Sequence, residues 1–147
     1  MAGESSVPVV QQALLGALSD YFDDTDVYYV GMGVPVHRVP DARERIYVLE
    51  HRELQREHNA AFVTERFTQE VQIEVKTADE DTVDSAVTRR WELFNELNAL
   101  LLRAPMKRHL DPDGGITGDR AVGNLPWEKG YIAFQIVEIG CKAKIAG

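Results

Sequence analysis

Cysteine, basic charge and long apolar runs are all scarce in this chain of 147 residues, and each scarcity excludes a class of protein. The single cysteine, Cys141, excludes an intramolecular disulfide, and its strand-like surroundings favour a buried apolar role over a reactive thiol. No run approaches the roughly 20 apolar residues of a membrane-spanning helix. The opening stretch, MAGESSVPVV, lacks the basic start and apolar core of a signal peptide. We therefore expect a protein that is assembled in a cytoplasm and has no membrane partner.

Basic residues are outnumbered: 16 Lys and Arg face 24 Asp and Glu, for a net charge of -8. Because nucleic-acid binding usually needs a basic surface, this balance argues against a DNA-binding protein. The hydrophobic share of 44% is enough for one sizeable core. At this length we expect a single domain, residues 1–147, with residues 1–6 flexible.

Apolar spacing predicts two amphipathic helices. In the first, residues 8–22, apolar residues recur every three or four positions, Ser6 is placed to cap the start, and Pro8 lies in the first turn. The second spans residues 80–102 and ends before Pro105. Its buried stripe is predicted to comprise Val83, Ala86, Val87, Arg90, Trp91, Phe94, Leu97 and Leu101. We expect it to pack through Trp91 and Phe94.

Strand patterns occupy much of the remaining chain. We predict strands at residues 26–32, 46–51 and 66–77, a short one after the turn sequence DPDGGITG, and a long one at residues 130–144. Residues 131–137 are apolar on both faces, which is typical of a central strand. The segment 52–66 is ambiguous between a charged loop, a hairpin tip and a short helix. The order of elements predicts an α+β fold, a mostly antiparallel sheet with two helices packed on one face.

The clearest strand contains a possible metal site. Glu74-Val75-Lys76 has the E-x-K pattern of many Mg²⁺-dependent nucleases, and Asp41 could supply a second carboxylate. However, the pattern continues a regular polar face, and Asp41 follows a proline in a loop. We keep a small nuclease that uses Asp41, Glu74 and Lys76 as the alternative to a structural strand with a solvent-exposed polar face.

Other catalytic signals are weak. The histidines His37, His51, His58 and His109 have no zinc-site spacing, so we expect them to be solvated loop residues. No serine lies in a G-x-S-x-G context, and the Gly114-Gly115 pair lacks the remainder of a phosphate loop. We predict no catalytic residue, no cofactor and no metal.

A mixed-charge segment offers a candidate subunit interface. It comprises Arg43, Arg45, Arg52, Glu53, Arg56 and Glu57. Such residues usually form a solvated face, but matched charges also set the register between protein partners. We expect them on a mobile loop that joins two strands.

Taken together, the pattern resembles a known family. An N-terminal helix and strand pair precede RFTQEVQIEVKT, the acidic step ADED, the helix AVTRRWELFNELNALLL, the turn GGITG and the final strand GYIAFQIVEIGCKAKI. This order is similar to that of the tail terminator proteins of long-tailed bacteriophages, of the lambda minor tail protein U type. Head-closure and neck connector proteins share much of the same pattern.

The resemblance implies a structural virion protein at the junction of tail and neck. Such proteins form a hexameric ring on the end of the tail tube, stop its polymerisation and present a surface to the head–neck connector. The implied partners are further copies of the chain, the major tail tube protein and the connector proteins, and genomic DNA passes through the lumen. An acidic wall would let DNA slide, and the candidates are Glu70, Glu74, Asp79, Glu80 and Asp81.

Overall fold

The fold is an α+β arrangement. The computed structural model describes residues 6–22, 25–29, 43–58, 61–77, 83–103, 106–110, 115–127 and 130–146. In order, they form α1 (Val7–Tyr21), β1 (Thr25–Tyr29), β2 (Glu44–His58), β3 (Phe62–Lys76), α2 (Val83–Leu101), the 3₁₀ helix η1 (Met106–His109), β4 (Ile116–Trp127) and β5 (Gly130–Ala146). The strands form one sheet in the order β1-β2-β3-β5-β4. Its β1–β2 pair is parallel and the other three pairs are antiparallel, which confirms the predicted fold class and mostly antiparallel sheet.

The first helix forms as its spacing predicts. Val10, Leu14 and Leu18 are buried at intervals of four residues, and Pro8 lies in the first turn, where its missing N–H leaves no bond unmade. Ser6 is the N-cap residue, but its side chain makes no capping hydrogen bond. Its hydroxyl donates to Glu65 of β3 instead, so this residue of the predicted flexible terminus is buried and bonded. Residues 1–5 lie outside the described part.

The centre of the sheet follows the predicted alternation. On β3, every odd-numbered residue from Val63 to Val75 is buried, and the register with β5 runs without a shift from Phe62 to Lys76. The alternation therefore extends further toward the N-terminus than the predicted start at residue 66. The fifth strand lies between β3 and β4, so the prediction of a central position for residues 131–137 is confirmed.

The second helix is rotated relative to its prediction. Its buried residues are Ala86, Arg90, Leu93, Leu97, Leu100 and Leu101. Trp91 is 43% exposed, so the prediction that this indole packs on the sheet is wrong, whereas Phe94 is partly buried against the core. Leu93 and Leu100 take the core positions because apolar residues surround too much of this helix for their spacing to fix its rotation. Of the predicted start, residues 80–82 lie outside the described residues.

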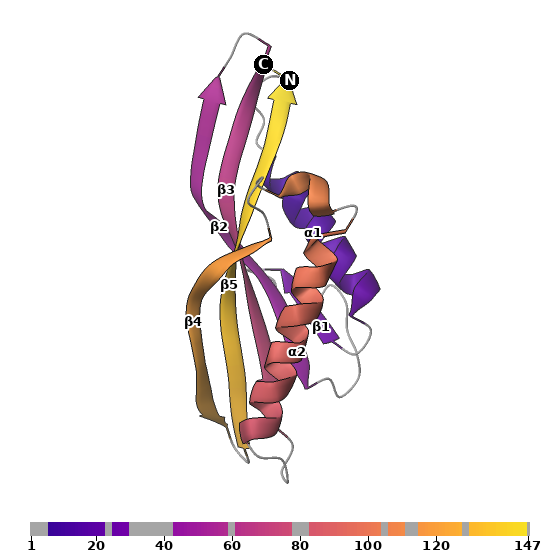
Figure 1. Cartoon of the computed structure of the whole chain (residues 1–147), viewed down its shortest axis with the longest axis vertical. Coiled ribbons are helices and arrows are strands. Elements are labelled where there is room, and N and C mark those ends of the chain that lie inside the picture. The colour runs from indigo at the N-terminus through magenta and orange to yellow at the C-terminus, as the bar shows by residue number, and fades with distance from the viewer. Residues whose placement is uncertain are drawn as a thin grey trace.

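Of the three alternatives for the segment 52–66, the described residues bear out the hairpin tip. The second strand continues to His58, and β3 begins at Phe62, with His58 paired to Val63. The prediction of a mobile charged loop is therefore wrong. In Figure 1 the ends of β2, β3 and β5 project together beyond both helices. We call this projecting part the arm: residues 51–58 of β2, 62–68 of β3 and 140–146 of β5.

The strand after the glycine turn is longer than predicted. It spans twelve residues, from Ile116 to Trp127, at the edge of the sheet. Gly115 directly precedes it with a φ of 81°, a conformation that favours glycine because glycine has no Cβ. Pro126 is tolerated near its end because an edge strand has one side that needs no ladder hydrogen bonds.

Candidate functional site

The arm carries most of the predicted interface residues. Arg52, Glu53, Arg56 and Glu57 lie in a stretch of β2, residues 52–58, in which every residue is classed as exposed. Arg43 and Arg45 lie at the other end of the strand, where Arg45 is opposite Glu74 of β3. The structure thus brings four of the six together and separates the other two.

One buried carboxylate ties the arm to the first helix. Glu65 of β3 is fully buried, and its Oε1 accepts hydrogen bonds from the Ser6 backbone N–H at 2.6 Å and the Ser6 hydroxyl at 2.8 Å. Its other oxygen accepts a 2.7 Å bond from Nε of Arg56. A buried ion pair holds only when additional hydrogen bonds satisfy its oxygens, as they do here. Arg56 is therefore part of a buried network and not simply a surface charge.

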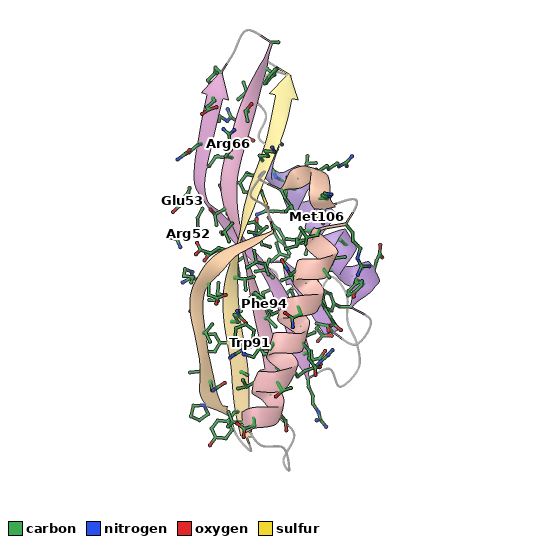
Figure 2. All side chains as sticks on the ribbon, viewed as in Figure 1. Arg52, Glu53, Arg66, Trp91, Phe94 and Met106 are labelled. Carbon is green, nitrogen blue, oxygen red and sulfur yellow. The ribbon has the colours of Figure 1, made fainter. Side chains whose placement is uncertain are left out.

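An irregularity in β2 reshapes the edge of the arm. Between the pairs Arg52–Thr68 and Gln55–Arg66 the register shifts, so that Glu53 and Leu54 oppose Phe67 alone. This is a β-bulge, a feature that redirects side chains and twists a strand edge. Glu53 has a φ of 57° and Leu54 is 41% exposed. Figure 2 shows Arg52 and Glu53 on the outer side of this edge.

Glu70 does not form part of the predicted acidic wall. This side chain is only 7% exposed and accepts a hydrogen bond from Nε of Arg120 of β4. Arg52 of the arm lies 3.8 Å from the same carboxylate oxygen. Glu70 is thus buried and neutralised by two arginines, so it does not form an exposed acidic surface in this chain.

Glu74 belongs to a polar and aromatic cluster. It lies opposite Arg45, and the neighbouring Tyr28 and Tyr47 rings stack with their centroids 4.8 Å apart. The guanidinium of Arg45 lies 5.9 Å from the centre of the Tyr28 ring. Burial, opposed by the hydrogen bond with Arg45 and reinforced by the Glu74 charge, raises the pKa of Tyr47 to about 12. The cluster thus packs the two tyrosine rings and the Arg45 guanidinium against one another.

The nuclease alternative gains no second carboxylate from the described residues. Asp41 lies outside them, as do Asp79, Glu80 and Asp81 of the predicted acidic wall. Within the described part of the chain, no three His, Cys, Asp or Glu side chains are grouped to hold a metal ion.

Lys76 lines a shallow pocket at the start of the second helix. The pocket has a volume of about 200 Å³, and its walls include Arg43, Glu44, Ser85 and Arg89. Arg89 donates to Glu44 and to Glu92, and these hydrogen bonds raise its pKa further above its usual range. Its charge is thus offset inside the protein, so this pocket is not a simple anion receptor.

Two features of the structure were not predicted from the sequence patterns. His109 is buried in η1 and not solvated, and burial together with the Arg108 charge lowers its pKa. Glu65 was not singled out, although a signal existed: it occupies an odd-numbered position between Val63 and Phe67, in the apolar register of its strand. A charged residue in such a register must find a buried partner.

Comparison with known proteins identifies no family for this chain. No protein-family model matches the chain, and no curated protein is significantly similar to it. Among the described helices, none has the length and apolar character needed to cross a membrane.

Proposed function

We propose that this chain is a tail terminator, a structural protein and not an enzyme. It forms a hexameric ring on the end of a bacteriophage tail tube. There it stops tube polymerisation and offers the surface to which head–neck connector proteins attach. It acts in the virion after assembly in the cytoplasm of the bacterial host, and it needs no cofactor.

The observation that carries this proposal is the arm. Three strands that project beyond the helices offer a long exposed edge. Charged side chains cover it, including the exposed pair Arg66–Glu57 at 3.2 Å. A head-to-tail ring needs such an element, because each subunit must contact its neighbour through a different surface from the one it receives. Matched charges on that element set the angle between subunits.

We further infer that both helices pack on one face of the sheet. Gln11 of α1 donates a 3.0 Å hydrogen bond to Gln69, an odd-numbered residue of β3. Arg89 of α2 binds Glu44, whose cross-strand partner is the odd-numbered Val75. Odd-numbered residues of one strand share a face. The opposite face, which carries the even-numbered Glu74, would then be available for the ring, with this carboxylate in its acidic lining toward the DNA.

The test uses the phage that encodes this chain. Deletion of the gene should give tails longer than normal in electron micrographs, and supplying the chain in trans should restore their length. Tails of normal length without the gene would contradict a terminator. Tails of normal length that fail to join heads would identify the chain as a head-closure or connector protein instead.

A matched pair of variants tests the arm within the same experiment. Leu54→Asp changes an exposed residue of the arm, and Val9→Asp changes a residue of α1 that is 61% exposed. Exposed substitutions usually change stability by less than about 0.5 kcal/mol, so both variants should fold. Only Leu54→Asp should fail to restore tail length. Equal rescue by both variants would remove the arm from the proposed function.

A further inference from the structure

One stretch at the edge of the sheet is left open. The fourth strand is an edge strand, and within the described part of the chain no other strand pairs with its outer side. Its first half has register irregularities after Ile116 and after Asp119, whereas residues 121–127 pair with β5 without a shift. In Figure 1 no described helix or strand runs along the outer side of β4. We call residues 121–126 the open edge.

The open edge carries no charge. Its sequence is AVGNLP, and its Val122 and Leu125, 47% and 53% exposed, lie on opposite faces of the strand because side chains alternate. Proteins protect exposed strand edges with charges and bulges, because an unprotected edge pairs with other chains. Residues 52–58 of the arm carry both, as does the first half of β4 with Asp119 and Arg120. The open edge has neither, so it is suited to pairing with another chain.

Two backbone N–H groups of the open edge point away from β5. Proline occurs in an edge strand where its missing N–H would face outward, so Pro126 marks one such position. In an antiparallel ladder, pairs that exchange hydrogen bonds alternate with pairs that do not. Asn124 and Val122, two and four residues before Pro126, therefore present their N–H groups on the same outer side. The backbone of the open edge is thus a template for one more strand.

Contacts on the inner side hold the open edge in its extended shape. Arg90 of α2 donates to the backbone carbonyls of Gly123 and of its cross-strand partner Phe134, at 3.4 Å and 3.3 Å. A Cβ on Gly123 would lie 3.2 Å from the Phe134 ring, so this ring packs closely against the glycine. Because the strand is already ordered, binding of a partner would require little further loss of its conformational freedom.

We propose that the open edge binds an extended, uncharged segment of a different protein, which adds a strand to the five-stranded sheet. Only another extended backbone can satisfy a row of N–H and C=O groups at this spacing. A charged side chain beside Val122 or Leu125 would lose hydration without a partner, because the open edge offers no opposite charge. A second copy of this chain is disfavoured as the occupant, since each copy has a net charge of -8 and the two would repel. The contact is separate from the ring proposed above and does not depend on it.

The test is an NMR titration of the isotope-labelled chain with a short uncharged peptide. The probe is acetylated and amidated SVTVSVT at millimolar concentration. The control peptide has the same side chains but an N-methyl group on every backbone nitrogen, so it cannot pair with a strand. The amide signals of Val122 and Asn124 should shift with the probe and not with the control. Absence of these shifts with the probe, or equal shifts with both peptides, would overturn the addition of a strand.

A matched pair of variants locates the contact on the backbone. Asn124→Pro removes one outward N–H group and keeps the pairing with β5, as Pro126 does, whereas Asn124→Ala changes the same side chain and keeps the N–H group. Asn124→Pro should weaken binding of the probe roughly tenfold, as expected for the loss of about one hydrogen bond, and Asn124→Ala should bind like the unchanged chain. Equal affinities of the two variants would show that the open edge does not pair with the probe. If Asn124→Pro does not fold, the comparison of the two peptides still decides.

The same spectra distinguish a partner protein from a second copy. If the amide signals of Val122 and Asn124 move with the concentration of the chain alone, the occupant of the open edge is another copy, and a different protein as partner is wrong. Tail length does not enter this test, so its failure leaves the terminator function standing. A chain that binds the probe but has no effect on tails would keep the open edge and lose the terminator function.

Discussion

Ser6 and Glu65, 59 residues apart in the chain, are joined by two hydrogen bonds to one buried carboxylate oxygen. The residue before the first helix is thereby fixed to the base of the arm. Because Arg56 binds the other oxygen of Glu65, the same carboxylate connects α1, β3 and the exposed edge of β2.

Replacing Glu65 by alanine should destabilise the fold strongly. The substitution leaves the buried backbone N–H and hydroxyl of Ser6 without their acceptor, and each unsatisfied buried polar group typically costs about 1–3 kcal/mol. The free energy of unfolding from urea titration measures the loss. Glu57→Ala removes the 74% exposed member of a surface pair and should cost less than about 1 kcal/mol. Similar losses in both variants would show that the Glu65 network does not stabilise the arm.

Trp91→Ala should have little effect on the stability of the isolated chain. The indole is 43% exposed, whereas Leu93 and Leu97 are fully buried. Leu93→Ala should cost about 2–5 kcal/mol, because it removes packed methyl groups and leaves a cavity. Thermal unfolding of the two variants gives the comparison. A larger loss for Trp91→Ala than for Leu93→Ala would mean that the helix is rotated toward the orientation expected from sequence.

Two glycine substitutions should have effects of opposite sign. Gly16 is exposed inside α1 with no atom within 4 Å of an added Cβ, so Gly16→Ala should stabilise the protein by roughly 0.5–1 kcal/mol. Gly115 has a φ of 81°, and an added Cβ would lie 3.2 Å from Asn98 Oδ1. Gly115→Ala should therefore destabilise the protein by about 1–2 kcal/mol. Urea midpoints measure both, and a stabilising Gly115→Ala would contradict the turn geometry.

Acidification should weaken the fold partly through His109. Burial and the neighbouring Arg108 charge lower its pKa in the folded chain, so below about pH 6.5 the unfolded chain binds more protons at this residue. Stability from His109 is therefore present above that pH and is lost as pH falls toward the lowered pKa. His109→Gln should flatten this part of the stability–pH curve, measured by urea titration between pH 7 and 5.

Sequence patterns predicted the elements that separate apolar from polar residues. The alternation in β3 and the four-residue spacing in α1 have a single buried face each, so the period alone identifies the element. The spacing of apolar residues did not identify the buried face of α2, because Trp91 and Leu93 are both apolar and point to different sides of the helix. Only packing against β3 and β5 decides between them.

The sequence left the hairpin of the arm as one of three alternatives, for a different physical reason. Residues 52–58 are exposed on both sides of their strand, so no alternation of apolar and polar residues marks it. Backbone pairing with β3 makes it a strand. The pairing of Glu70 with Arg120 could not be predicted from the sequence either. The two residues are 50 positions apart, and only the register of β4 on β5 brings them together.

The unshifted pairing of β3 with β5 has a mechanical consequence. From Phe62 to Lys76 the two strands cross from the arm into the body without a bulge, whereas β2 is interrupted at two places. The β3–β5 pair should therefore resist bending, whereas the neighbouring β2 is more easily deformed. A force applied to the end of the arm is resisted by the continuous backbone hydrogen bonds between β3 and β5. It therefore moves the arm and the rest of the sheet together.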